Sequence, residues 1–375
     1  MVFLVNLARI VFAPLLEEFI AVFHIGEGTA GLIATLAWLG SALLRLPAGW
    51  LLTRVRRHRV VLATGTVLAG AAAFTASATS VVMIGAGALL MGLASGAYFV
   101  AANPLVSELY PHRVGWAMGV HGMMAQVAAV AAAPLVTLVL RLFVDWRLVF
   151  VAIAVAAAVA TLALFVASRG TDLPEAGARD RDLLAAVRSQ WRIVLLGVVI
   201  VGTTGFVWQG LFNFYELYMR TKGLDATTAK NLLTVIFAAG VPAFVVSGRL
   251  VDRLPRVPYI LAIVGAFTVS VLALTVTRGL VPILALTTVI GYVVHSLFPA
   301  IDTYLLDTLP DDSRASAYAW YSAGMMVVQA TGSSAVGILR EHGFAYDAIF
   351  TRLALALALV VCGLLVLQRL DRLPQ

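Results

Sequence analysis

Two arginines lie inside long apolar runs of this sequence, and they are the first candidates for chemistry. Arg9 lies in the first run, and Arg45 lies near the end of the second. A charged group at the middle of a bilayer costs about 2.5–3.5 kcal/mol on insertion scales, so each arginine requires a partner or an aqueous cavity. Because arginine keeps its proton, it acts as a fixed site for an anion or as a permanent ion-pair partner. Both interpretations stay open. A third is that each side chain extends to the nearer membrane interface and is solvated there.

Acidic residues also lie within or at the ends of apolar runs. Glu17 approaches the outer end of the first run, Glu216 holds a similar place in the seventh, and Asp302 lies in the tenth. A carboxylate in a partly dry cavity can exchange a proton near neutral pH, which is the chemistry of proton coupling. We therefore expect one of these three residues to take up and release a proton; the alternative is a solvated acid at the membrane interface.

Uncharged polar and aromatic residues form a third group of candidates. Gln209 and Asn213 are one helical turn apart and share a face, and His295 titrates near neutral pH when it is unperturbed. Aromatic side chains with a few polar groups suit an organic solute, although hydrogen bonds between helices would use the same residue types. The predicted substrate-binding residues are Arg9, Arg45, Tyr98, Gln126, Trp208, Gln209, Asn213, His295 and Tyr321.

The composition indicates that lipid surrounds much of the chain. Of the 375 residues, 61% are hydrophobic and 12% are charged, whereas soluble domains carry roughly 25% charged residues. The net charge of +7 comes from short basic segments between apolar runs, as in cytoplasmic loops, so nucleic-acid binding is a poor interpretation. The single cysteine excludes an intrachain disulfide and offers no metal set. No cofactor and no metal are expected.

Twelve apolar runs are long enough to span a membrane. They cover residues 2–23, 29–52, 59–78, 81–104, 114–138, 147–168, 192–218, 227–250, 257–277, 280–304, 315–338 and 349–368. The longest link, 169–191, divides them into two sets of six. We therefore predict an all-α membrane protein of twelve transmembrane helices, with bundles at 1–168 and 192–375 joined by a cytoplasmic linker at 169–191.

The basic residues predict the orientation of the chain. Most of the 26 lysines and arginines fall in the loops on the same side as residues 54–59. That side should face the cytoplasm, which places both termini inside the cell and the protein in the cell membrane.

The two halves resemble each other at a constant offset of 199 residues, which places Gly49 on Gly248 and Arg54 on Arg253. The same offset places Glu108 on Asp307. Several matches at one offset, each at a corresponding loop, predict two parallel six-helix repeats related as in transporters.

The segment Gly248-Arg-Leu-Val-Asp252-Arg253-Leu-Pro-Arg256 resembles the motif that follows the second span in the major facilitator superfamily. Residues 49–57 resemble it with two departures, Thr53 for the acid and Arg56 for the turn glycine, and Tyr110-Pro111-His112-Arg113 resembles the link between the fourth and fifth spans. The resemblance covers the whole chain and implies a secondary transporter. We interpret the motif as a cytoplasmic gate, in which small residues let helices approach each other and arginines form ion pairs with acids. The expected gate residues are Gly49, Arg54, Glu108, Gly248, Asp252, Arg253 and Asp307; the alternative is that the arginines only set topology.

The resemblance implies rocker-switch transport of a small organic solute by a monomer in a lipid bilayer, coupled to protons or another ion. Arg9 and Arg45 lie deeper in their runs than the glutamates, which favours an anionic or neutral solute.

One alternative is a proton-driven multidrug or cation exporter, although the fourth-span arginine typical of these exporters is absent at Ala88. Residues 44–49 are similar to the second-span pattern of nitrate/nitrite porters, which leaves an inorganic-anion porter open, but Phe244 stands where their paired arginine would be. A transport-fold sensor or receptor is the non-transport alternative. No motif of a nucleotide-binding or metalloprotease site is visible, so an enzyme is not expected.

Overall fold

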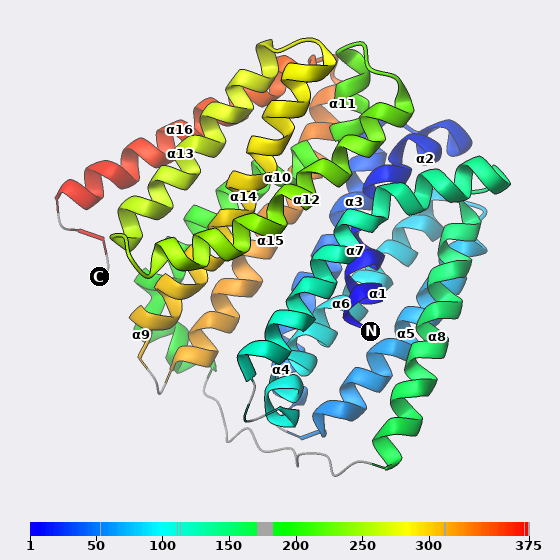
Figure 1. Cartoon of the computed structure of the whole chain (residues 1–375), viewed down its shortest axis with the longest axis horizontal. Helices are drawn as coiled ribbons and strands as arrows, with labels where there is room; N and C mark the ends of the chain where they lie inside the picture. Colours follow the sequence, from blue (N-terminus) through cyan, green and yellow to red (C-terminus); the bar gives the residue numbers. More distant parts are fainter. Residues whose placement is uncertain are drawn as a thin grey trace. The chain divides into compact units, whose positions relative to one another are not determined.

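The computed structural model describes residues 1–52, 54–110, 112, 114–170, 183–310, 313–370 and 372–373. Within them, helices are the only long regular elements (Figure 1). The chain divides into two compact units, Met1–Arg181 and Asp182–Gln375, called here the N-terminal and the C-terminal unit. Thr53, Pro111, Arg113 and residues 171–182 of the expected linker lie outside the described residues.

Helices of the N-terminal unit follow the first six apolar runs. Their bounds are α1 Val2–Ile10, η1 Ala13–Leu15, α2 Leu16–Phe23, α3 Glu27–Leu43, α4 Arg45–Leu51, α5 Arg57–Ala76, α6 Val81–Leu109, α7 Val114–Phe143 and α8 Arg147–Arg169. The first run is broken into three pieces, because Pro14 lies in the 3₁₀ turn η1 and cannot donate to a continuous helix. The second run breaks at Leu44, immediately before Arg45.

The C-terminal unit repeats this pattern. Its elements are α9 Leu183–Gly197, η2 Val198–Gly202, α10 Thr203–Asn213, α11 Tyr215–Thr221, α12 Ala226–Val251, α13 Arg256–Val276, α14 Leu280–Thr308, α15 Arg314–Glu341 and α16 Tyr346–Arg369. The π-helical turn η2 joins α9 to α10, and α10 ends just before α11. Because α9 begins at Leu183, the last part of the expected 169–191 linker is helical.

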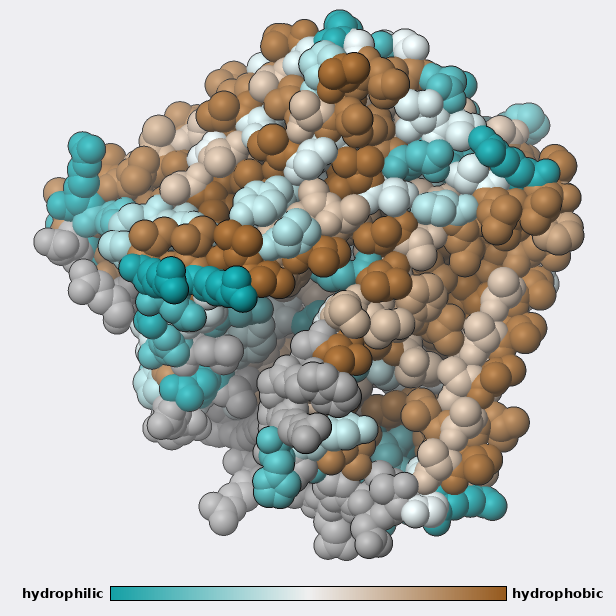
Figure 2. All heavy atoms as spheres, in the orientation of Figure 1, coloured by the Kyte–Doolittle hydropathy of each residue, from teal (hydrophilic) through white to brown (hydrophobic). Residues whose placement is uncertain are grey.

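Eleven helices of the described chain are long and apolar enough to cross a membrane. The segmented first run, α1 to α2, supplies the remaining predicted span. The outer helices expose large apolar side chains, as lipid-facing helices do. Figure 2 shows such residues over α8; they include Val151, Val155, Val159, Leu162 and Val166. The predicted all-helical membrane architecture is therefore confirmed.

Glycines bring pairs of helices into close contact within each unit. A Cβ on Gly92 of α6 would collide with the backbone of Ala37 on α3, and a Cβ on Gly291 of α14 would collide with Ile236 on α12. In contrast, no described atom lies within 4 Å of the Cβ positions of Gly49 and Gly248. Within each unit, these close approaches therefore lie nearer the middle of the spans than the two motif glycines do, and the gate role of Gly49 and Gly248 stays a prediction.

Candidate functional site

Arg9 is the best-defined charged group inside the N-terminal unit. It lies in the last turn of α1 and is 7% exposed, and its hydrogen bonds within the described residues go to neutral groups. Its Nη2 donates to Asn6 Oδ1 (2.5 Å), and its Nη1 donates to Ser41 Oγ (3.3 Å). Asn6 is one turn earlier on α1 and is itself fixed through a bond from its Nδ2 to the carbonyl of Ala125 (2.6 Å). The α1 helix, α3 and α7 therefore hold the guanidinium in one orientation.

Aromatic rings contact the same guanidinium. Its central carbon lies 4.7 Å from the ring centre of Trp38 and 5.1 Å from that of Phe99. Arginine has five N–H donors, and Nε is buried without a hydrogen-bond partner among the described residues, as is the indole Nε1 of Trp38. The positive charge of Arg45, half-buried at the start of α4, also acts on Arg9. Two unsatisfied donors and two cations in one cluster suit an anion.

The other predicted residues of this unit lie beside the cluster. Tyr98 on α6 is buried, and its hydroxyl is 3.2 Å from His121 Nε2, with the two rings stacked at 5.9 Å. His121 also contacts Phe99 edge to face. Gln126 is half-buried on α7, next to the Ala125 carbonyl that holds Asn6.

His295 is enclosed by aromatic rings in the C-terminal unit. It is 4% exposed on α14, and the ring centres of Trp208, Phe237, Phe244 and Phe298 lie 5.5–6.4 Å from it. Its Nδ1 is 2.7 Å from the carbonyl oxygen of Gly291. A carbonyl oxygen only accepts, so Nδ1 carries the proton, and in the neutral ring Nε2 is an acceptor.

Gln209 and Asn213 share a face of α10, as predicted, and that face meets α15. Asn213 Nδ2 donates to Gln209 Oε1 (3.0 Å) and to Ser333 Oγ (2.9 Å), and Ser333 donates to the carbonyl oxygen of Gln209 (3.1 Å). These bonds join the two helices. Asn213 Oδ1 is buried and accepts no bond from the described residues.

Glu216 lies at the start of α11 and forms a buried ion pair that the sequence analysis missed. Lys230 Nζ, in the first turns of α12, is 3.5 Å from Glu216 Oε1, and the two side chains are 8% and 3% exposed. Lys230 lies near the start of the predicted span 227–250, where a lysine normally reaches water. Asp302 on α14 accepts a bond from the hydroxyl of Tyr318 (2.8 Å), and the ring of Tyr318 contacts buried Tyr321 at 5.4 Å. Glu17 is half-buried on α2.

The acids of the expected gate pair with the last arginine of the motif in each repeat. Glu108 at the end of α6 accepts a bond from Arg57, and Asp307 on α14 lies 2.5 Å from Arg256. These arginines open α5 and α13, which places them beside the ends of α6 and α14. The gate roles expected of Arg54 and Arg253 stay predictions.

The remaining gate residues lie at the surface of each unit. Arg54 is exposed between α4 and α5, and its guanidinium lies 4.0 Å from the ring centre of Trp50. Asp252 and Arg253 are exposed after α12. The two observed ion pairs, Arg57–Glu108 and Arg256–Asp307, are related by the offset between the halves, so both repeats use the last arginine of the motif.

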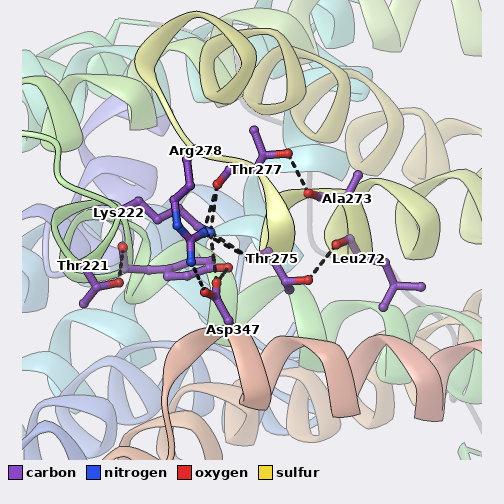
Figure 3. A network of polar contacts seen from close by, with 9 residues as sticks. Thr221, Lys222, Leu272, Ala273, Thr275, Thr277, Arg278 and Asp347 are labelled. Carbon is purple, nitrogen blue, oxygen red and sulfur yellow. Dashed lines mark hydrogen bonds and ion pairs between the residues drawn. The ribbon is translucent and has the colours of Figure 1, made fainter.

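A polar network joins three elements at the other ends of the helices (Figure 3). Lys222 Nζ donates to Asp347 Oδ1 (2.9 Å) and to the carbonyl oxygens of Thr275 and Thr277 (both 3.2 Å), and Arg278 Nη2 donates to Asp347 Oδ2 (2.7 Å). Burial lowers the pKa of the Lys222 ammonium, and the charge of Asp347 opposes that effect. The network ties the turn after α11 to the α13–α14 link and to the start of α16.

Comparison with known families agrees with this arrangement. The family model of the Major Facilitator Superfamily matches residues 1–294 and 232–374, which together cover nearly the whole chain. This chain belongs to the major facilitator superfamily. It is therefore a multi-pass membrane transporter, and the family resemblance of the sequence is confirmed. No curated protein sequence matches the chain significantly.

Solved transporters of the superfamily share the fold at low sequence identity. A bacterial homologue of the human lysosomal transporter Spinster, inward-facing and occupied, has 18% identity and a TM-score of 0.77, over 98% of this chain and 95% of that chain. The unoccupied form has 17% identity and a TM-score of 0.73, over 97% and 93%. A mutant of the nucleoside transporter NupG has 11% identity and a TM-score of 0.80, over 97% and 98%. At these identities the likeness concerns the fold.

Proposed function

We propose that this major facilitator protein transports a small organic anion, and that Arg9 anchors the anionic group. The main support is that Arg9 is buried on α1 and that, among the described residues, its hydrogen bonds go to Asn6 and Ser41 and its guanidinium lies over two aromatic rings. A buried charge without a counter-charge is costly. An anionic solute beside the cluster would supply that counter-charge.

A purely structural role explains the contacts of Arg9 less well. An arginine kept to join helices would be expected to bond an acid or to satisfy all of its donors. An arginine that reaches the membrane interface would be exposed, whereas Arg9 is not. Arg45 adds a second positive charge instead of a negative one. These points favour an anionic solute over a neutral one.

Proton coupling through Glu216 is the second part of the proposal. The ammonium of Lys230, 3.5 Å away, favours the ionised carboxylate. Proton uptake by Glu216 would leave the buried ammonium of Lys230 with less charge compensation, and this change is the proposed coupling step. Asp302, bonded by Tyr318, and Glu17 on α2 are the alternative coupling sites.

Rocker-switch alternating access by a monomer in the plasma membrane, with both termini in the cytoplasm, completes the proposal. The ion pairs Arg57–Glu108 and Arg256–Asp307 would act as the cytoplasmic latches. They occupy equivalent positions in the two repeats, which is what a gate built from repeated units requires.

A thermal-shift screen of the purified protein tests the anion proposal. The ligands are organic acids, inorganic anions, sugars and lipophilic cations, and a ligand at 100 times its dissociation constant should add about 2.7 kcal/mol of stability. We expect organic acids to stabilise the parent and not Arg9→Gln. Arg169→Gln is the matched control, because Arg169 is exposed and also lies over an aromatic ring, that of Phe165.

Two outcomes would contradict the proposal. One is stabilisation by organic acids that is as strong in Arg9→Gln as in the parent. The other is stabilisation by lipophilic cations that disappears in Glu216→Gln, which would indicate a proton-driven cation exporter. Nitrate and nitrite serve as the inorganic members of the screen, and a response to them alone would indicate an inorganic-anion porter.

A further inference from the structure

Two recesses lie in a row between α5 and α8 of the N-terminal unit, two helices that pack side by side (Figure 1). The first has a volume of about 330 Å³, and its lining includes Leu62 and Ala69 of α5 and Ala158 of α8. The second, of about 150 Å³, is lined by residues that include His58, Leu62 and Ser168. Because Leu62 lines both, the recesses form one continuous groove, called here the α5–α8 groove.

The groove has the length of the hydrocarbon in one leaflet of a bilayer. It runs along α5 from His58 to Ala69, which at the rise of an α-helix is about 16 Å. On α8 it runs in the opposite direction along the chain, from Ser168 to Ala158. The hydrocarbon core of a bilayer is about 30 Å thick, so each leaflet contributes about 15 Å. An acyl chain that starts at the His58 end would therefore reach the Ala69 end.

The wall of the larger recess is apolar. Thr66 and Thr161 line it, but each hydroxyl donates to the carbonyl four residues earlier in its own helix, at 3.1 and 2.7 Å. Ala69 and Ala158 line the same recess with small side chains, which leaves space between the helices. An α-helix of another chain is about 10–12 Å across with its side chains, too wide to enter a recess of this volume. Hydrocarbon is therefore the matching ligand.

Basic residues lie at one end of the groove. His58 lines the smaller recess, and Arg56 and Arg59, on either side of it in the sequence, are exposed. The charges of both arginines act on His58. Arg57 of the same segment forms an ion pair with Glu108. Basic residues at a bilayer surface attract anionic lipid headgroups.

The second repeat lacks this basic end. At the offset between the halves, Arg57 corresponds to Arg256, and each forms an ion pair with an acid of its own unit. Arg56 and Arg59 correspond instead to prolines, at positions 255 and 258. The ion pair that the repeats share therefore does not account for Arg56 and Arg59, whereas a ligand of the N-terminal unit alone does.

We propose that the α5–α8 groove binds one acyl chain of an anionic phospholipid, whose headgroup lies at Arg56 and Arg59. Leu105 and Leu109, which line the smaller recess, bracket Glu108 in α6. The bound lipid therefore also contacts the helix end that carries this acid. This binding does not depend on the transported solute and goes beyond the proposed function.

Native mass spectrometry of the purified full chain in detergent tests the proposal, because it counts bound lipids. The probes are dioleoyl phosphatidylglycerol, which is anionic, and dioleoyl phosphatidylcholine, which has the same chains and no net charge. We expect the first phosphatidylglycerol to bind at least about fivefold more tightly than the first phosphatidylcholine, because one basic residue near an anionic headgroup contributes about that factor.

A variant that fills the groove assigns the acyl chain to it. Ala158→Phe places a bulky ring in the larger recess and should abolish the tight binding of phosphatidylglycerol. Ala163→Phe is the matched control, because Ala163 is also an exposed alanine of α8 but does not line the groove. Thermal unfolding in detergent checks that both variants are folded.

Variants of the basic end assign the headgroup. Arg56→Gln/Arg59→Gln should remove the preference for phosphatidylglycerol while phosphatidylcholine still binds. Arg249→Gln/Arg369→Gln is the matched control: it removes the same charge from exposed arginines of the C-terminal unit and should keep the preference.

Several results would overturn the lipid site. They are equal binding of the two lipids by the parent, tight phosphatidylglycerol binding that survives in Ala158→Phe, and a preference that survives in Arg56→Gln/Arg59→Gln. A dimer of the parent that Ala158→Phe abolishes would also overturn it, because the groove would then hold a second copy of the chain. None of these results bears on anion binding at Arg9, which the thermal-shift screen tests separately.

Discussion

The buried pair of Lys230 and Glu216 gives a sharp prediction about stability. Two unit charges 3.5 Å apart attract by about 5 kcal/mol at an effective dielectric constant of about 20. Desolvation cancels much of this gain for the intact pair, but removal of one partner leaves a buried charge and typically costs about 3–5 kcal/mol. We therefore expect Lys230→Gln and Glu216→Gln each to destabilise the C-terminal unit by at least 2 kcal/mol at pH 7.

A double-mutant cycle isolates the interaction from other effects of each substitution. Thermal unfolding in detergent would be followed for the parent, both single variants and the double variant. The double variant should be more stable than the sum of the single effects predicts, by about 2 kcal/mol or more. The matched control is Arg256–Asp307, whose side chains are about half exposed, and whose coupling should stay below about 1 kcal/mol. Strict additivity for Lys230 and Glu216 would refute the reasoning.

Three further predictions concern the ends of helices. Val144 follows α7 with φ at +56°, and the aligned residue in the second repeat is Gly343, with φ at +84°. We therefore expect Val144→Gly to raise the free energy of unfolding by about 1 kcal/mol and Gly343→Val to lower it, both measured by thermal unfolding. Asp347→Asn should cost about 2 kcal/mol in the same assay, because it removes the charge that compensates the buried ammonium of Lys222. Bonds from the Thr228 hydroxyl and backbone N–H lower the pKa of Asp225, which caps α12. The cap therefore stabilises the fold above the unfolded pKa, near 4, and its contribution is lost as the pH falls further, so the melting difference between the parent and Asp225→Ala should shrink toward pH 3.

Hydropathy was enough to predict the spans, because a run of about 20 apolar residues has few other stable environments. The break in the first span has a visible signal in Pro14, since proline cannot donate to the helix. Likewise, Asn6 and Arg9 are three residues apart on one helix, so their contact could have been inferred. The resemblance of the motifs was enough to predict the family.

Side-chain pairing could not be predicted from hydropathy. Lys230 lies near the end of an apolar run, where a lysine normally reaches water, and only its position relative to Glu216 shows that it is buried. The arginine that meets Glu108 depends on where α5 begins, and a helix start is uncertain by a few residues in any sequence analysis. The rings around His295 come from three helices, and their meeting depends on tertiary packing.

Counterflow in proteoliposomes tests the central claim, that Arg9 anchors an organic anion during transport, without requiring knowledge of the direction or the coupling ion. Vesicles would be loaded with the unlabelled organic acid that most stabilises the parent in the thermal-shift screen, and uptake of the same acid in labelled form would be followed at about pH 7.5, where carboxylic acids are ionised. The account predicts a transient accumulation of label with the parent and with Arg169→Gln, and none with Arg9→Gln at equal reconstitution. Equal accumulation with Arg9→Gln and the parent would contradict it.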